Sequence, residues 1–141
     1  MDVPYYEWDG QPGRESKELT PLHEALHAAV AQILGGTAYS ITLDDSGGGS
    51  ALTGDVKWHW MDVATWLAPA LINDISSGDA EFLKRQNHYQ RGFAWGWLKR
   101  NRRRIMRLAN KIANQIGRPP GRLRWDPETT RWTWKHRRPK R

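Results

Sequence analysis

Residues 20–36 read TPLHEALHAAVAQILGG, and this stretch predicts a helix that carries metal-binding chemistry. Thr20 and Pro21 are typical of an N-cap and of the first helical position. The Gly35-Gly36 pair is typical of the end of a helix. We therefore expect a helix of about four turns with one face in a core. The apolar residues that follow the 3 and 4 spacing of that face are Leu22, Leu26, Ala29, Val30 and Ile33.

This helix contains a His-Glu-x-x-His motif, formed by His23, Glu24 and His27. Residues four apart lie on the same face of a helix, so both imidazoles can reach one metal ion. Glu24 is placed where its carboxylate can accept a proton from water at that ion. The combination is typical of zinc-dependent hydrolysis. The alternative is a purely structural pair of buried histidines, and the helical setting favours the metal site.

A zinc site of this type requires a third protein ligand, and the spacing leaves its identity open. The metzincin class would have a glycine and a histidine where this chain has Val30 and Ile33, so that class is excluded. The chain contains no cysteine, which excludes thiolate ligands and disulfides. Two histidines and one carboxylate favour zinc. The candidates for the third ligand are Asp62, Asp74, Asp79, Glu81, Glu128, His59 and His88.

Charge divides the 141-residue chain into two unlike parts, although its net charge is +7. Residues 1–90 contain 5 Lys and Arg against 13 Asp and Glu, whereas residues 91–141 contain 17 against 2. The acidic part suits a cation site. The basic part, which is rich in tryptophan, suits nucleic acid, an acidic protein or the acidic part of the same chain. The arginines expected to bind a polyanion from one helix are Arg100, Arg102, Arg103, Arg104 and Arg107.

A hairpin is expected directly after the motif helix. Residues 39–43 and 50–53 have the composition of strands, and the Gly-rich segment 44–49 between them is typical of a turn. The backbone of either strand could pair with an extended peptide at the edge of a sheet. The residues proposed for this substrate contact are Ile41, Thr42, Leu43, Ala51 and Leu52.

The remainder predicts more helix and a second hairpin. Helices are expected over 62–75, shortened or kinked at Pro69, from about Asp79, and over 93–116. Residues 122–134 are typical of a hairpin. Its tryptophans are expected to pack on the body of the protein, and a base-stacking platform is the alternative.

These patterns predict a mainly α protein with a small β-hairpin or sheet beside the motif helix, an α+β fold. We expect an irregular arm at 1–19, a compact domain at 20–117, and a basic hairpin and tail at 118–141. The sequence has neither a secretory signal pattern nor a run of about twenty apolar residues that could span a membrane. A cytoplasmic protein without membrane contact is therefore expected.

Four short segments follow one another along residues 23–81, and their order can be compared with that of a known family. HEALHAAV at 23–30 is followed by ITL at 41–43, GSALTG at 49–54 and SGDAE at 77–81. In this order they resemble the peptidase domain of the FtsH-type zinc proteases, and the similarity covers residues 20–90. Weaker parts of the resemblance are LAPAL at 67–71 and RIMRLA at 104–109.

The resemblance implies a zincin-like fold with one Zn²⁺ per chain, held by His23, His27 and Asp79. Asp74 is the rival third ligand, and Glu24 is the general base. The implied activity is hydrolysis of extended or unfolded protein segments. Because the sequence has no Gly-x-x-x-x-Gly-Lys loop, we expect this activity to be independent of ATP. The alternative is a binding protein whose Arg- and Trp-rich C-terminal region holds nucleic acid or an acidic protein, beside a structural or degenerate metal site.

Overall fold

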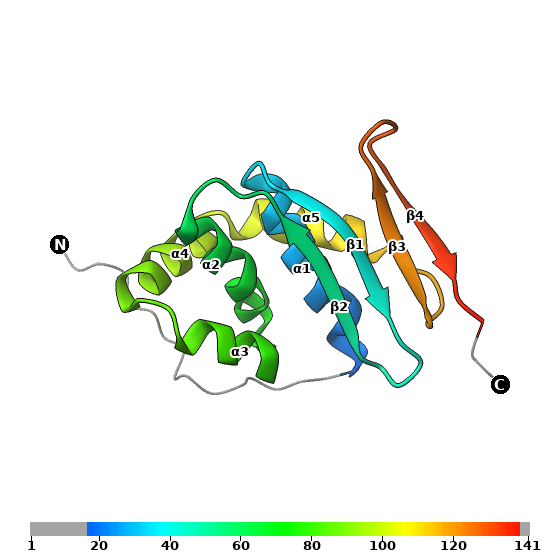
Figure 1. The fold of residues 1–141 in the computed structure, drawn as a ribbon, viewed down its shortest axis with the longest axis horizontal. Helices are drawn as coiled ribbons and strands as arrows, with labels where there is room; N and C mark the ends of the chain where they lie inside the picture. Colours follow the sequence, from blue (N-terminus) through cyan, green and yellow to red (C-terminus); the bar gives the residue numbers. More distant parts are fainter. Residues whose placement is uncertain (1–16, 139–141) are drawn as a thin grey trace.

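A computed structural model describes residues 17–138, so the arm expected at 1–19 lies almost wholly outside the described residues. A four-stranded antiparallel sheet stands against a group of helices (Figure 1). The helices are α1 (Thr20–Ile33), α2 (His59–Leu67), α3 (Ser77–Lys84), α4 (His88–Arg100) and α5 (Arg102–Ala113), with short 3-10 turns at Lys17–Leu19 and Ala68–Ile72. The strands are β1 (Thr37–Leu43), β2 (Gly49–Gly54), β3 (Gly121–Asp126) and β4 (Arg131–His136). The predicted α+β class is confirmed.

The order of strands in the sheet is β2-β1-β3-β4, and every pair is antiparallel. The two hairpins are therefore joined edge to edge through β1 and β3. Ile41 pairs with Ala51 on one side and with Leu123 on the other. β1 is thus an internal strand, and β2 and β4 are the two edge strands.

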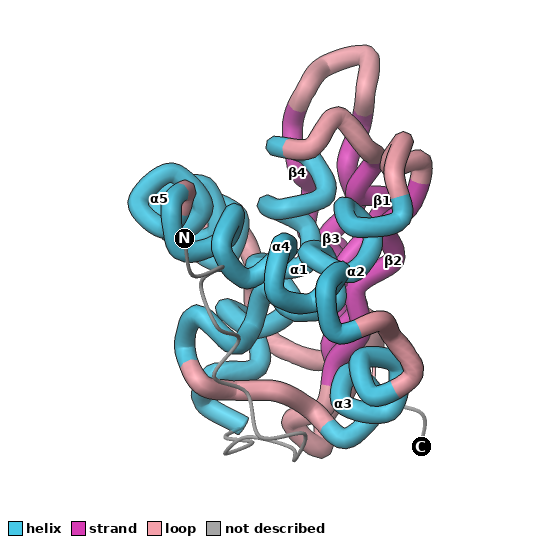
Figure 2. The backbone as a smooth tube through the Cα atoms, turned by 90° about the vertical axis from the view of Figure 1, so that its left-hand side faces the viewer, coloured by secondary structure: helices cyan, strands magenta, loops and turns pink. Residues whose placement is uncertain are grey.

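The motif helix α1 is the centre of the fold. Figure 2 shows the sheet on one side of α1 and α5 on the other. Every residue from His23 to Ala31 is buried as a result. The many alanines of this stretch, at 0–1% exposure, let both neighbouring layers approach the helix closely. The two histidines of the motif are consequently held by packing on all sides of their helix.

The motif helix ends as predicted and begins slightly differently. Leu34 caps its C-terminus, and Gly35 follows with φ +82, a conformation that glycine adopts without strain. Thr20 was expected as the N-cap, but Leu19 holds that position and Thr20 is already helical. The Thr20 hydroxyl instead donates to the Gly47 carbonyl at 2.8 Å, which ties the start of α1 to the β1–β2 turn.

The prediction of one continuous helix over 93–116 is wrong, because the chain forms α4 and α5 with a break at Asn101. The Asn101 side chain donates to the Trp97 carbonyl at 2.8 Å, and its backbone leaves the helical region. Asparagine often competes for backbone hydrogen bonds in this way. The helix predicted over 62–75 is shortened as expected, since α2 becomes a 3-10 turn at Ala68 and Pro69. None of the described helices has the length and apolarity needed to cross a membrane.

The second hairpin forms as predicted and belongs to the main sheet. Leu123 is fully buried and Trp132 is 8% exposed, and both are part of the main core. Trp125 and Trp134 pack against that core as well. These tryptophans therefore pack on the body of the protein, as expected for this hairpin. The expected boundary between residues 117 and 118 falls inside a unit that shares one sheet and one core.

Candidate metal centre

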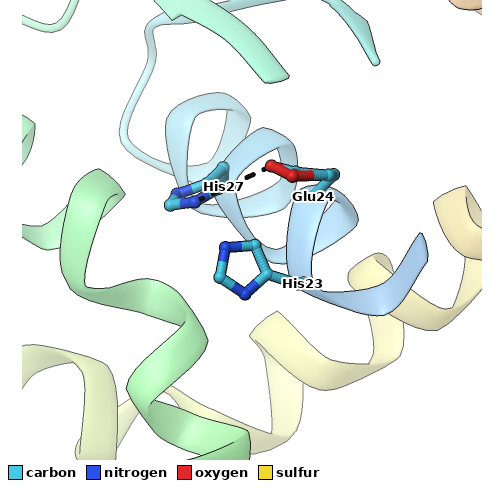
Figure 3. Close-up of side chains that lie close together, drawn as sticks. All are labelled: His23, Glu24 and His27. Carbon is cyan, nitrogen blue, oxygen red and sulfur yellow. Dashed lines mark ion pairs between the residues drawn. The ribbon is translucent and has the colours of Figure 1, made fainter. Parts of the chain in front are cut away.

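Helix α1 brings the three residues of the motif together in a buried group. His23, Glu24 and His27 are 6–7% exposed, and one potential ligand atom from each lies within 4.8 Å of the others. The two imidazole rings have centroids 5.0 Å apart. Figure 3 shows both rings and the Glu24 carboxylate on the same side of the helix. This group could hold a metal ion.

Each imidazole is oriented by an acceptor at its Nδ1 atom. His27 Nδ1 donates to the Thr65 carbonyl at 2.7 Å, and His23 Nδ1 donates to Asp74 Oδ2 at 3.1 Å. Because a carbonyl can only accept, the proton of neutral His27 is on Nδ1 and the lone pair is on Nε2. Both Nε2 atoms therefore face the same point in the site. Acceptors of this kind behind metal-binding histidines fix the ring and increase its basicity.

Asp79 occupies the point toward which both imidazoles are directed. Its Oδ2 atom lies 3.0 Å from His23 Nε2 and 3.1 Å from His27 Nε2. Tetrahedral zinc with bonds of about 2.0–2.1 Å would separate its ligand atoms by about 3.3 Å. The two observed distances are therefore within a few tenths of an ångström of that separation, and they are also ordinary hydrogen-bond lengths.

Helix α3 places Asp79 at this position. Ser76 is the N-cap, and its hydroxyl accepts from the Asp79 backbone N–H at 3.1 Å. The N-cap role thus belongs to Ser76, and Asp79 lies in the first turn of the helix. The Asp79 carboxylate is thereby left for the histidines. Asp74, the rival third ligand, instead lies behind His23, where its Oδ1 atom is buried without a hydrogen bond.

The group carries excess negative charge, because three buried carboxylates face two imidazoles. Burial lowers the pKa of His23, but its hydrogen bond to Asp79 and the nearby carboxylates outweigh this effect and raise the pKa to about 9. The pKa of His27 is raised for the same reasons. Burial raises the pKa of Asp79, yet the two imidazoles overcome it and hold the pKa well below its usual range. The site thus attracts positive charge, which a divalent cation would supply.

Glu24 has the properties of a group that exchanges protons. Burial raises its pKa above the ordinary value of 4.5, although His27 and His23 oppose the shift. Its Oε1 atom lies 4.0 Å from His27 Nε2, the contact drawn in Figure 3. A carboxyl of raised pKa beside a candidate metal position is suited to accept and return a proton.

A pocket of about 590 Å³ opens above the metal-binding group. The β1–β2 turn and β2 form one wall, and Trp66 lies on the other. Trp66 stacks on Phe82 with ring centroids 4.5 Å apart, and its ring meets His27 edge to face at 6.4 Å. The pocket therefore combines polar groups at its base with an aromatic wall.

The two strands expected to contact substrate hold different positions in the sheet, because β1 is internal and β2 is an edge strand. Ile41 and Leu43 are buried, and the β1 backbone pairs on both sides, so Ile41, Thr42 and Leu43 cannot offer a free edge. β2 does offer one, and Ala51 lines the pocket. Leu52 is 61% exposed and is not among the pocket residues. The edge role is left to the backbone of β2.

Other residues considered from the sequence lie apart from this group. His59 is exposed and bonds to Gln86, and Glu81 is exposed and pairs with Arg85. The arginines expected on a single helix are exposed but divided, with Arg100 at the end of α4 and Arg102, Arg103, Arg104 and Arg107 on α5.

Sequence reasoning missed the Thr65 carbonyl and the aromatic wall. A backbone carbonyl leaves no signal in residue identity, because every residue has one. Trp66 lies in the helix expected over 62–75, but its place beside the pocket depends on tertiary packing. The chain matches no protein-family model, no curated protein and no solved structure, so the chemistry of this centre is interpreted from its own geometry.

Proposed function

We propose that the protein is a zinc-dependent peptidase. The observation that carries the proposal is the position of Asp79 Oδ2 between the Nε2 atoms of His23 and His27, at 3.0 and 3.1 Å. Both imidazoles are fixed from behind by acceptors at Nδ1. A pocket opens above these three residues, which a purely structural pair of histidines would not need.

His23, His27 and Asp79 would hold one Zn²⁺ per chain. When bound in such a site, zinc acts as a Lewis acid that lowers the pKa of water and polarises a carbonyl oxygen. Asp74 and the Thr65 carbonyl keep both imidazoles in the tautomer that presents Nε2. Their contribution is therefore to keep the two imidazole ligand atoms in place through the reaction.

Glu24 performs the proton transfers in this proposal. Its carboxylate accepts a proton from the attacking water, whose oxygen forms a bond to the scissile carbonyl carbon. The protonated Glu24 then donates that proton to the leaving nitrogen as the C–N bond breaks. Burial raises the pKa of Glu24, which makes its carboxylate a stronger base than an exposed glutamate.

The arrangement of β2 suits an extended substrate. Within residues 17–138 its outer edge pairs with no other strand, and β2 borders the pocket beside Glu24. A peptide could therefore pair with its backbone and pass over the metal-binding group. The sequence resemblance to the FtsH-type peptidase domain, which implies a zincin-like fold, agrees with this proposal. We further propose that hydrolysis needs no ATP and acts on unfolded or extended segments, in the cytoplasm.

Metal content and proteolysis test the proposal together. Purified wild type should contain about one zinc per chain by mass spectrometry. His23→Ala and Asp79→Ala should lose it, and Glu24→Gln should keep it. An unfolded casein with quenched fluorophores serves as substrate. Wild type should cleave it, and Glu24→Gln should be about 10²–10⁴-fold slower.

Two results would contradict the proposal. The first is a wild-type protein that stays free of metal after incubation with zinc. The second is a zinc-loaded Glu24→Gln variant that cleaves casein as fast as wild type, which would remove Glu24 from the reaction.

A further inference from the structure

We propose that the outer face of the sheet binds the phosphate backbone of a nucleic acid. α1 packs on the inner face of the sheet, while the outer face of β1, β3 and β4 is left uncovered by the described helices (Figures 1 and 2). An uncovered face of this kind is expected to be polar, and here it is strongly basic.

The strand register places hydroxyl and basic side chains in rows across this face. Thr42 pairs with Arg122, which pairs with Lys135. In the next row, Ser40 pairs with Arg124, which pairs with Thr133. Ile41 and Leu123, which alternate with them, are buried in the core, so these rows point outward.

Arg122 and Lys135 form a like-charge pair directly across two strands, an arrangement that destabilises a sheet. No ion pair to a carboxylate relieves it within residues 17–138. Arg122 Nε donates to Thr42 Oγ1 at 3.1 Å, which fixes the guanidinium on the face and leaves its terminal nitrogens for a ligand. An anion between the two cations would remove the repulsion.

Arg122 and Lys135 border a groove of about 820 Å³, and Arg137 and Arg138 line it as well. Asp44 and Asp45 form one rim. Asp44 Oδ1 already accepts from the Ser46 backbone, the Ser46 hydroxyl and the Gly48 backbone, so this carboxylate oxygen is satisfied within its turn. The rest of the groove is dominated by basic groups.

A nucleic acid fits these rows better than an acidic protein does. Stable protein interfaces are centred on aromatic or aliphatic anchors, whereas protein–nucleic acid interfaces are more polar and more positively charged. The two rows across β1, β3 and β4 contain only hydroxyl and basic side chains. Arginine and hydroxyl groups are common donors to phosphate oxygens.

This surface differs from the arginine cluster expected from the sequence. The α5 arginines lie on the far side of α1 from the sheet (Figure 2), so one short nucleic acid would contact only one of the two groups. The groove is also distinct from the zinc-site pocket. Ser46, Gly47 and Gly48 line that pocket, whereas Asp44 and Asp45, earlier in the same turn, line the groove. The proposal therefore stands independently of peptidase activity.

Fluorescence anisotropy with labelled probes tests the surface. The probes are a random 20-base-pair DNA duplex, the corresponding single strand, a 20-base-pair RNA duplex, and poly-glutamate as the acidic polypeptide. We expect wild type to bind at least one nucleic acid at 50 mM salt with a Kd on the order of 1–10 µM, and more tightly than poly-glutamate.

Two matched double variants locate the contact. Arg122→Gln with Lys135→Gln should weaken nucleic acid binding at least about tenfold and reduce the slope of log K against log salt by about two. Arg103→Gln with Arg107→Gln removes the same charge from α5 and should change the affinity less than about threefold. All four side chains are exposed, so neither variant should lower the midpoint of thermal unfolding.

If the sheet double variant is misfolded, Arg124→Gln alone provides a milder change on the same face, with an expected loss of about threefold. The proposal is overturned if wild type binds no nucleic acid at 50 mM salt. It is also overturned if the α5 variant loses as much affinity as the sheet variants, or if poly-glutamate binds more tightly than every nucleic acid.

Discussion

At the scale of single residues, His23 shows how two similar carboxylates acquire different functions. Asp74 accepts from its Nδ1 atom at 3.1 Å, and Asp79 lies 3.0 Å from its Nε2 atom. Only Asp79 also reaches His27. In the proposed site, Asp79 is therefore the carboxylate placed to share a metal ion with both imidazoles, whereas Asp74 orients one ring. The two aspartates lie five residues apart, on opposite sides of the Ser76 cap.

Replacing Asp74 by asparagine should weaken zinc binding about 10–100-fold while leaving the site able to fill to one zinc per chain. An amide can still accept from His23 Nδ1, but it lacks the charge that makes the imidazole more basic. Competition with a chromophoric chelator measures the affinity. Asp45→Asn, an exposed change on the β1–β2 turn, is the matched control and should have no effect. If Asp74→Asn cannot be filled and Asp79→Asn can, the two roles are reversed.

The metal-free protein should lose stability as pH rises. The ordinary pKa of His23 is 6.5, and Asp79 and its neighbours raise it to about 9 in the folded state. The folded state then keeps a proton that the unfolded state releases. This contribution is complete below pH 6.5 and is lost as pH rises through about 9, with an upper bound of about 3 kcal/mol.

Urea unfolding of chelator-treated protein between pH 6 and 9.5 measures this loss. Zinc-loaded protein should not show it, because metal replaces the Nε2 protons. His23→Gln should flatten the profile of the metal-free protein. A metal-free protein that is more stable at pH 9.5 than at pH 6 would contradict the assignment of a protonated His23.

At the scale of elements, the start of α3 couples helix stability to the metal centre. Ser76 caps the helix through the backbone N–H of Asp79. Ser76→Ala should therefore cost about 1 kcal/mol in unfolding free energy and also weaken zinc binding, whereas Ser76→Thr should retain both. Urea unfolding and chelator competition give the two values.

Gly78→Ala is the control for this helix. Gly78 is helical and exposed, and an added Cβ would find only Ser76 Oγ nearby, at 4.0 Å. It should raise stability by up to about 1 kcal/mol and leave zinc affinity unchanged. A loss of zinc binding in Gly78→Ala, with Ser76→Ala unaffected, would show that the cap does not position Asp79.

Elements with strong local signals could be predicted from the sequence. The motif helix was expected to stop at Gly35 and does so, because the left-handed backbone there favours glycine. The break at Asn101 was missed, since apolar spacing continues across it and only a side-chain hydrogen bond reveals it. Sequence spacing alone could not select Asp79 among the candidates for the third ligand. Its position depends on how α3 packs beside α1 and α2, which is tertiary information.

At the scale of the whole molecule, charge and sequence order suggested an appendage at 118–141, but strand pairing makes its hairpin part of the sheet. β3 pairs with β1 over four residues. Local patterns identify both hairpins correctly, yet they contain no information on which hairpin edges join. The acidic and basic parts of the chain thus share a single core, in which Leu123 and Ile41 are neighbours across two strands.

A chain ending at residue 117 should therefore fail to fold cooperatively. The truncation removes Leu123 and Trp132 from the core and leaves β1 with an exposed, unpaired edge. In the full chain, Leu123→Ala should lower the free energy of unfolding by about 2–5 kcal/mol, which gives the scale for one lost core residue. Arg131→Ala, at an exposed site, should lower it by less than about 0.5 kcal/mol. Circular dichroism during thermal unfolding measures all three. If the 1–117 chain unfolds cooperatively at the wild-type midpoint, the β3–β4 hairpin is an independent appendage, as its composition alone suggested.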